Sequence, residues 1–405
     1  MTIHVVGGFY KEHCTRPAWD ETYGSGGRAA AAISSFGTKV TFHTYTSARS
    51  LEQLKLFATV YPMTTQTTQI SETVSFRYLH DLANPEIFHL PRMPAAPLRV
   101  KADHVVRFGM LEGDAIVDAE WAVYDPQNQG APIAFSENGS TARHLALVLN
   151  GWEAKQMAGL PSATALECAT TIADKHKAEV VIIKQGAQGA FVWTPTGSIH
   201  VPAYRTKLVW KIGSGDCFVA YFAQAWMVQK LPPAEAADLA SRATAYYCAT
   251  RGFATAAALT DNPLSPIRSH FPEEIQQRKR VYLAGPFFHL GQIWLIEQAR
   301  TLLQSAGLDV FSPFHDIGLG SAQDVVQKDI EAIHGCDLLF AVADGLDPGT
   351  IFEIGYARCL KKPVIIYSEV QVGQENLKMM EGTDCEIYSS FATAIYATRW
   401  KAVES

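Results

Sequence analysis

Six apolar residues, Leu338-Leu-Phe-Ala-Val-Ala343, run directly into the loop and helix pattern Asp344-Gly-Leu-Asp-Pro-Gly-Thr-Ile-Phe-Glu-Ile-Gly-Tyr-Ala357. An apolar run of this length predicts a short strand buried on both faces of a parallel sheet. Asp344 therefore stands where the strand ends, and Gly345 turns the chain. Open parallel sheets bind ligands at that edge, so the polar residues that follow become candidates for a binding site.

We expect a helix after this loop, capped by Thr350 and ended by Lys361-Lys362-Pro363. Glu353 then lies in the first turn, where free N–H groups and the helix dipole favour a carboxylate, as suits a nucleophile that attacks an electron-poor carbon. Thr350-x-x-Glu353 is also the pattern of a capping box, in which the glutamate only closes the helix end. The local pattern leaves both interpretations open.

The flanking segments favour the first interpretation. Residues 280 to about 380 resemble the nucleoside 2-deoxyribosyltransferase family, on three pieces that occur in order: Tyr282-Leu-Ala-Gly-Pro286, the spacing of Asp329 and Asp337, and Asp347-Pro-Gly-Thr-Ile-Phe-Glu-Ile-Gly-Tyr-Ala357. The resemblance implies a smaller doubly wound, flavodoxin-like parallel sheet. It also implies Glu353 as nucleophile on the anomeric carbon, Asp329 as proton donor near the base, Asp347 as a ligand of the nucleoside, and Tyr282 beside the glutamate.

Other binding positions follow only from this resemblance. The family completes its pocket with an Asn and a Met from a neighbouring subunit, and Asn376-Leu-Lys-Met379 is a loose match that implies a homo-oligomer, at least a dimer. No cofactor is implied for this part of the chain. The remaining substrate-binding positions implied are Gly285, Pro286, Phe287, Asp344, Gly349 and Thr350.

The chemistry explains why two acids would be grouped here. Breaking an N-glycosidic bond builds positive charge on the sugar and negative charge on the departing base, so a site needs an anion below the sugar and a proton source near the base. Glu353 would form a glycosyl-enzyme, which an incoming base or water resolves. The sequence leaves transferase and hydrolase both open.

The strongest N-terminal pattern is Trp210-Lys-Ile-Gly-Ser-Gly-Asp-Cys-Phe218, which opens an apolar helix to about Gln229. Glycines at a helix start leave N–H groups free to hold an anion, and an acid just inside the helix can take a proton from an attacking hydroxyl. An ordinary helix cap is the alternative.

Residues 1 to about 260 resemble the ribokinase-like (PfkB) family of carbohydrate and nucleoside kinases, an α/β/α sandwich. The matching pieces, in order, are Asp125-Pro-Gln-Asn128, Asn150-Gly-Trp-Glu153, Lys184-Gln-Gly-Ala-Gln-Gly189 and Gly213-Ser-Gly-Asp216. The resemblance implies ATP and Mg²⁺, with Asp216 as catalytic base. It places Gly213, Ser214 and Gly215 at the transferred phosphate, Asn150 and Glu153 near magnesium, and Lys184, Gly186 and Gly189 near the nucleotide.

Two departures from the family matter. Trp210, Lys211 and Ile212 stand where an Asp and a Thr are usual, and Arg28 stands where an Asn commonly touches the sugar. Arginine offers a planar cationic fork, so we expect Arg28 to bind a ligand more acidic than a plain sugar, such as a nucleotide. A domain that keeps the fold without transferring phosphate remains open.

The whole chain of 405 residues is long enough for two α/β domains. We expect a ribokinase-like domain at 1–262, a Pro-rich linker at 263–278 and the second domain at 279–405. Strands are expected at 104–108, 122–124, 146–149 and 180–184, with helical spacers between several of them, which suggests a mostly parallel sheet covered by helices.

Composition narrows the function classes. The net charge of −6 disfavours nucleic-acid binding. Seven scattered cysteines fit a reduced, cytoplasmic protein, and no segment has the length of a membrane span. The preferred hypothesis is a fusion enzyme acting on nucleosides or nucleotides. One alternative is a nucleotide-binding pseudokinase that controls a nucleotide or NAD glycohydrolase, and another is a binding protein with both sites inactive.

Overall fold

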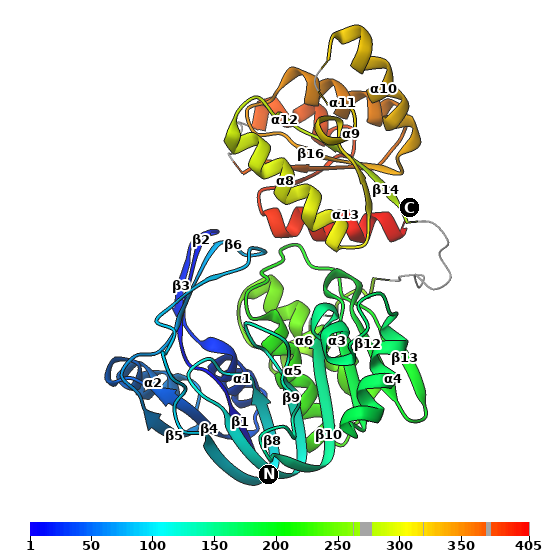
Figure 1. Cartoon of the computed structure of the whole chain (residues 1–405). Coiled ribbons are helices and arrows are strands. Elements are labelled where there is room, and N and C mark those ends of the chain that lie inside the picture. The colour runs from blue at the N-terminus through cyan, green and yellow to red at the C-terminus, as the bar shows by residue number, and fades with distance from the viewer. Residues whose placement is uncertain (262, 268–277, 319, 370–373, 405) are drawn as a thin grey trace. The chain divides into compact units, whose positions relative to one another are not determined.

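The computed structural model is described here for residues 1–261, 263–267, 278–318, 320–369 and 374–404, without the side chains of 322, 324 and 374–376. The chain divides into two units (Figure 1). The first comprises Met1–Thr206 and Trp210–Pro266, and the second comprises Lys207–Val209 and Ile267–Ser405. The boundaries expected at 262 and 279 stay a prediction, because residues 262 and 268–277 lie outside the described part.

The first unit is built on a nine-stranded sheet in the order β13-β12-β11-β10-β9-β8-β1-β4-β5. Only the pairs β11–β12 and β12–β13 of this sheet are antiparallel. The bounds are β1 Thr2–Val6, β4 Lys39–Thr46, β5 Thr64–Gln69, β8 Leu98–Phe108, β9 Ala115–Asp125, β10 Thr141–Asn150, β11 Val180–Lys184, β12 Ala190–Thr194 and β13 Gly197–Val201.

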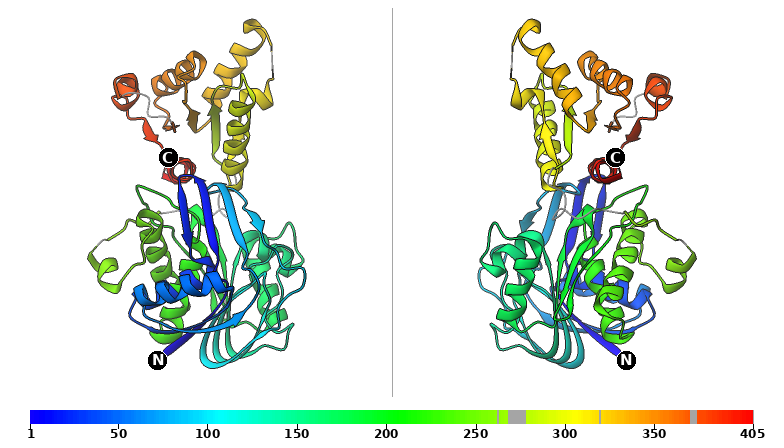
Figure 2. Two further views of the ribbon diagram at one scale, coloured as in Figure 1. Left: turned by 90° about the vertical axis from the view of Figure 1, so that its left-hand side faces the viewer. Right: turned by 90° about the vertical axis from the view of Figure 1, so that its right-hand side faces the viewer.

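A smaller sheet in the order β3-β2-β6-β7 stands away from the edge of the large one (Figure 2). Its strands are β2 Lys11–Arg16, β3 Trp19–Thr22, β6 Ser75–His80 and β7 Glu86–Phe88. β2 carries the alternating burial pattern of a strand with one covered face, and Glu12 lies on that covered face.

Helices of the first unit lie on both faces of its large sheet. One core joins the alanine-rich helix α1 to α5, α6 and residues such as Val5, Phe42 and Val106, while the other joins α3 and α4 to residues such as Val6, Leu147 and Val181. The bounds are α1 Gly24–Ser35, α2 Ala48–Val60, α3 Gly151–Ala158, α4 Ala165–His176, α5 Ser214–Ala223 continued by a π-helical turn Gln224–Val228, α6 Pro233–Thr250 and α7 Ala256–Asp261, with a 3-10 turn at Gly186–Gln188.

The central strands β8, β9 and β10 double back on themselves. β8 and β9 pair in parallel from Leu98↔Ala115 to Phe108↔Asp125, although only residues 109–114 connect them. A straight strand of eleven residues is about 35 Å long, which so short a connection cannot span. Each strand therefore leaves the carboxyl edge, bends and returns to it, as Figure 1 shows near the N-terminus.

This bend explains why the expectation of helical spacers is met only between β10 and β11, where α3 and α4 lie. No helix lies between β8 and β9 or between β9 and β10, all within the described residues. We call the part of each strand before the bend its first arm and the part after it the second arm. The first arms cover the sheet where helices were expected, because Leu98, Val100, Ala115 and Val117 belong to the same core as α3 and α4. The strands expected at 104–108, 122–124 and 146–149 are confirmed as the second arms.

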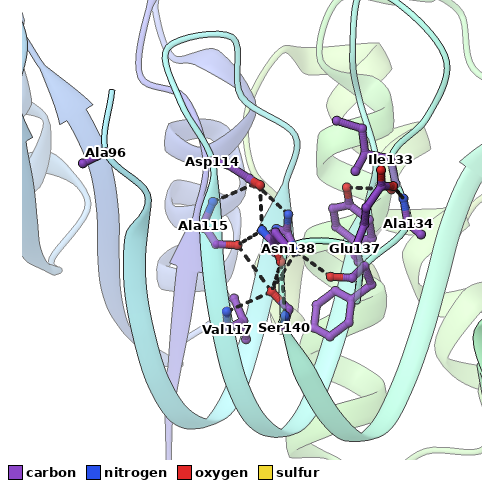
Figure 3. A network of polar contacts seen from close by, with 12 residues as sticks. Ala96, Asp114, Ala115, Val117, Ile133, Ala134, Glu137, Asn138 and Ser140 are labelled. Carbon is purple, nitrogen blue, oxygen red and sulfur yellow. Dashed lines mark hydrogen bonds and ion pairs between the residues drawn. The ribbon is translucent and has the colours of Figure 1, made fainter. Parts of the chain in front are cut away.

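A buried polar network ties the arms together (Figure 3). Arg107, 1% exposed, donates to Asp114 Oδ1 (2.7 Å), Ser140 Oγ (3.1 Å) and the carbonyl of Phe135 (3.1 Å). Ser140 Oγ also accepts from the N–H of Val117 at 3.0 Å. The end of β8 is thereby joined to the beginning of β9 and to the residue before β10.

The second unit is a five-stranded parallel sheet in the order β15-β14-β16-β17-β18. This is the flavodoxin-like order, so the expected α/β class is confirmed for both units. The bounds are β14 Arg280–Ala284, α8 Leu290–Ser305, β15 Asp309–Phe311, α9 Pro313–Asp316, α10 Ala322–Gly335, β16 Leu338–Val342, α11 Pro348–Cys359, β17 Val364–Tyr367, α12 Gln374–Glu381, β18 Glu386–Tyr388 and α13 Phe391–Glu404.

No helix among the described residues is long and apolar enough to cross a membrane.

Candidate active sites in the two units

The candidate site of the second unit lies where the strand order reverses. β14 has β15 on one side and β16 on the other, and the chain leaves β14 toward α8 and β16 toward α11. The carboxyl ends of two such neighbouring strands form a crevice in open parallel sheets. Tyr282 comes from β14 and Glu353 from α11, so side chains far apart in the sequence meet where the strand order reverses.

Tyr282 and Glu353 are directly bonded. The buried Tyr282 hydroxyl donates to Glu353 Oε1 at 2.6 Å. Asp329 of α10 lies close to the same hydroxyl, and its Oδ1 is buried without a hydrogen-bond partner among the described residues. The structure thus brings together three of the predicted catalytic side chains.

The start of α11 differs from the expectation. Asp347, not Thr350, caps the helix: its Oδ2 accepts from the Thr350 N–H at 2.8 Å and from Thr350 Oγ1 at 3.0 Å. Pro348 is the first helical residue, so Glu353 lies in the second turn. The expected first-turn position of Glu353 is therefore wrong, and so is the capping-box alternative, because the Glu353 side chain bonds Tyr282 instead.

Burial controls the charge of Glu353. It raises the pKa of the Glu353 carboxyl to about 7, and the negative charges of Asp329 and Asp347 add to the rise. The hydrogen bond from Tyr282 opposes this by stabilising the carboxylate. Burial also raises the pKa of Asp329. Two acids with raised pKa values in one crevice suit a pair that exchanges a proton with a substrate.

The other predicted positions of this unit lie on the loop after β14, at the end of β16, at the start of α11 and on α12. Gly285 is a packing position, because a Cβ there would lie 2.5 Å from Ile296 Cδ1, and it opens the loop of Pro286 and Phe287. The ring of Phe287 stacks on that of Phe288, with 5.7 Å between the ring centroids, and its centroid lies 5.3 Å from that of Phe314. Asp344 accepts from Ser368 Oγ at 3.1 Å.

Two neighbours of Asp347 and the proposed intersubunit pair complete the set. Gly349 and the buried Thr350 form the first turn of α11 beside Asp347. Met379 is 78% exposed on α12. The side chain of Asn376 lies outside the described residues.

The candidate site of the first unit is the beginning of α5. Gly213 has φ 76°, a left-handed conformation that favours glycine, and leads into Ser214 without a side-chain cap. Lys211 Nζ donates to Ser214 Oγ at 2.8 Å, and Lys184 Nζ lies 3.5 Å from where a Cβ of Gly215 would be. The Ser214 N–H already donates to the Lys211 carbonyl at 3.1 Å. The rest of this helix start, together with two ammonium groups, fits a phosphate group.

Arg28 changes the expected chemistry of Asp216. Arg28 Nη1 donates to Asp216 Oδ2 at 3.0 Å, and Gln127 Nε2 donates to Asp216 Oδ1 at 2.8 Å. Arg28 itself is 0% exposed and pairs also with Glu12. The expectation that Arg28 offers a free fork to an acidic ligand is not met, because two carboxylates already occupy it.

The magnesium positions are only partly suited to a metal. Asn150 and Glu153 cap α3 reciprocally, through Glu153 N–H to Asn150 Oδ1 (2.9 Å) and Asn150 N–H to Glu153 Oε2 (2.7 Å). The described residues contain no group of three or more His, Cys, Asp or Glu side chains arranged to hold a metal. A magnesium ion would take most of its oxygens from the phosphates and water.

Lys184 and the glycines of its motif lie at the end of β11. Lys184 Nζ bonds the buried Asp125 Oδ2 at 2.5 Å, and burial raises the pKa of Asp125 against the effect of this lysine. Asp125 Oδ1 has no partner among the described residues. Gly186 and Gly189 have φ values of 59° and 96°, and a Cβ at Gly189 would lie 2.1 Å from the Val201 carbonyl.

Sequence reasoning missed Glu12 and Gln127. Glu12 lies in a polar strand outside any motif, and Gln127 belongs to the stretch Asp125-Pro-Gln-Asn128 at the end of β9 but is given no role by it. The signal that could have found Glu12 is Arg28 itself, because a buried guanidinium requires acidic partners. For Gln127 the signal is its place in the motif, since it bonds Asp216 and not Arg28.

In each of the two units, one segment matches the model of a known protein family. The family described as nucleoside 2-deoxyribosyltransferase matches residues 281–382, which contain the Tyr282, Asp329 and Glu353 group. The family described as pfkB family carbohydrate kinase matches residues 142–260, which contain the start of α5. The chain thus joins a domain similar to pfkB family carbohydrate kinases to a domain similar to nucleoside 2-deoxyribosyltransferases.

Individual relatives are more distant. A 5-dehydro-2-deoxygluconokinase of Listeria innocua is 41% identical over 49 residues, which span 12% of this chain and only 15% of that relative. A Methanocaldococcus jannaschii nucleoside kinase structure gives a TM-score of 0.49 at 12% identity, over 64% of this chain and 97% of that one. A fructokinase structure from Vibrio cholerae gives 0.48 at 14% identity, over 64% and 98%.

Proposed function

We propose that the second unit cleaves or exchanges the N-glycosidic bond of a nucleoside or nucleotide, with Glu353 as nucleophile. The observation that carries this proposal is the 2.6 Å bond between Tyr282 and Glu353 at the reversal of strand order, beside an acid with an unused buried oxygen. A glutamate that only stabilised the start of α11 would bond the backbone of that helix, whereas Glu353 bonds a buried tyrosine of strand β14.

The reaction follows from the roles of the two acids. Glu353 Oε forms a bond to the anomeric carbon while the bond from that carbon to the base nitrogen breaks and its electron pair leaves with the base. Asp329, with its raised pKa, gives a proton to the departing base. An incoming base or water then attacks the anomeric carbon and releases Glu353, which makes the unit a transferase or a hydrolase, respectively.

The test incubates the protein with a panel of nucleosides, deoxynucleotides and NAD and measures the released base by chromatography. We expect Glu353→Gln to lower release by a factor of at least about 1,000, because an amide cannot form the glycosyl ester. Glu381→Gln, which changes an exposed glutamate of α12, is the matched control and should keep the wild-type rate. Equal rates for wild type and Glu353→Gln on every substrate contradict the proposal.

Two candidate functions remain for the first unit. One is phosphorylation of the nucleoside or the released sugar by ATP with magnesium, with Asp216 as base, which would make the chain a bifunctional enzyme. The other is binding of a nucleotide without phosphoryl transfer, as a sensor for the second unit. The engagement of both Asp216 oxygens by Arg28 and Gln127 favours the second. ATP that stimulates base release without being consumed would support it.

A further inference from the structure

Arg28 is the most connected side chain of the first unit that the family resemblance does not explain. It comes from α1 and reaches three other elements: β2 through Glu12, α5 through Asp216 and α6 through Tyr247, whose hydroxyl accepts from Arg28 Nε at 3.0 Å. The guanidinium therefore touches an acid of the small sheet and the acid of α5 at the same time.

The guanidinium also fills the space beside the helix start. A Cβ on Gly213 would lie 2.0 Å from Arg28 Nε, so the arginine rests directly on the turn that opens α5. A general base needs the hydroxyl that it deprotonates within about 3 Å. On Asp216, Arg28 and Gln127 hold one oxygen each at that distance.

Aromatic contacts also connect the small sheet to residues that flank the start of α5. Trp19 of β3 lies 5.0 Å from Trp210, centroid to centroid, and the Arg251 guanidinium lies over both rings, at 5.5 and 4.3 Å. Glu12, 2% exposed, is fixed below by Arg28. Ion pair and aromatic contacts together hold the small sheet over Asp216.

We propose that Arg28 is a built-in stop: it occupies the place of a phosphoryl acceptor beside Asp216 and ties the small sheet to α5. The first unit then binds a nucleoside triphosphate at Lys184, Lys211 and the start of α5 without transferring its γ-phosphate. This inference rests on the proposed phosphate site of the first unit and is independent of the reaction at Glu353.

The stop can be removed by substitution. With Arg28→Asn, an acceptor hydroxyl or water can approach Asp216 and lose its proton to the carboxylate. Its oxygen then bonds to the γ-phosphorus while the bond to the bridging oxygen breaks and ADP leaves. Because a positioned base contributes about 10²–10⁴-fold, we expect ADP formation to rise about 100-fold or more over wild type.

The experiment uses the full chain with Mg²⁺ and γ-labelled ATP, in the presence of ribose, deoxyribose, fructose, nucleosides or water alone. Wild type, Arg28→Asn, Asp216→Asn and the double variant are compared, with Arg99→Asn, an exposed arginine of β8, as matched control. ATP binding is measured by calorimetry. We expect wild type to bind ATP without turnover, Arg28→Asn to gain turnover, and the double variant to lose it.

Several results overturn the proposal: Asp216-dependent phosphoryl transfer by wild type, failure of wild type to bind ATP, or a folded Arg28→Asn that binds ATP and stays inactive. If Arg28→Asn does not fold, Arg28→Lys and Arg28→Gln replace it, because each side chain is smaller than the guanidinium beside Asp216 and keeps a hydrogen-bond donor. ATP binding without turnover in wild type, together with a gain of turnover in either variant, then supports the proposal, and absence of that gain in a folded variant that binds ATP overturns it. Base release measured in the same samples reports separately on Glu353.

Discussion

Glu353 shows how the surroundings of a candidate residue can differ from those expected from the sequence. The sequence places an acid after a buried strand, and that position holds. The helix dipole was expected to favour its carboxylate, but Glu353 lies in the second turn and burial raises its pKa to about 7. The signal for the true helix start was present, because Pro348 after Asp347 is the pattern of a first helical residue behind its cap.

The raised pKa of Glu353 predicts the pH dependence of base release. A nucleophilic carboxylate must be ionised, so the rate should increase with pH through a midpoint near 7. The Tyr282 hydroxyl stabilises the carboxylate, so Tyr282→Phe should move that midpoint to higher pH and lower the rate at pH 7. The pH–rate profiles of wild type and variant measure both effects. Tyr388→Phe, in β18, should leave the midpoint in place; a midpoint that falls in Tyr282→Phe would contradict the assigned hydrogen bond.

His43 predicts a loss of stability in mild acid. Its Nε2 lies 2.9 Å from His4 Nδ1, and burial lowers its pKa to about 4. The unfolded chain binds a proton near pH 6.5 that the folded chain takes up only near pH 4. Stability contributed by the neutral ring is therefore complete above about 6.5 and lost as the pH falls toward 4, by about 3 kcal/mol.

Thermal unfolding of wild type and His43→Gln at pH 5 and 7.5 measures this. The variant should lose part of the difference between the two pH values, whereas His13→Gln, at an exposed position of β2, should keep all of it. An unchanged difference in His43→Gln would refute the assignment.

At the scale of elements, the doubled-back strands mark the limit of prediction from sequence. The second arms, such as Ala146–Leu149, are apolar runs and were predicted. The first arms alternate apolar with polar residues, as in Leu98–Ala102, and were not predicted. What decides the bend is pairing between arms of different strands, which local periodicity does not contain.

Ser140 should be a sensitive point of this arrangement. Its hydroxyl oxygen serves Arg107 Nη1 and the N–H of Val117. Ser140→Ala leaves two buried donors with a lost partner, so we expect the free energy of unfolding to fall by about 1–3 kcal/mol. Denaturant titration measures the change. Ser162→Ala, at an exposed position, is the control; a loss below about 0.5 kcal/mol for Ser140→Ala would show that the network is dispensable.

At the scale of the whole molecule, the two α/β classes and the grouping of Tyr282, Asp329 and Glu353 follow from motifs in sequence order. The state of the Asp216 site does not follow from them. Its partners Glu12, Arg28 and Gln127 come from three separate segments, and only the fold brings them to one helix start.

The exposed Met379 leads to a prediction about assembly. Completion of the second site by a neighbouring chain requires at least two chains of 44.4 kDa in solution. Met379→Asp places a charge on this 78% exposed apolar position, so we expect a smaller species and slower base release. Light scattering and the base-release assay measure the two effects. Met93→Asp, 81% exposed in the first unit, is the control; unchanged mass and rate in Met379→Asp would argue against a shared site.

The bent strands have a consequence for how the chain acquires its structure. β8 and β9 are neighbours both in sequence and in the sheet, with Leu98 beside Ala115, and β10 follows with Thr141 beside Asp118. Pairings between segments so near in sequence close short loops and form early, unlike most parallel sheets. The middle of the first unit can thus assemble as soon as residue 150 has been synthesised, and serve as the template on which β1 and β11 add from opposite sides.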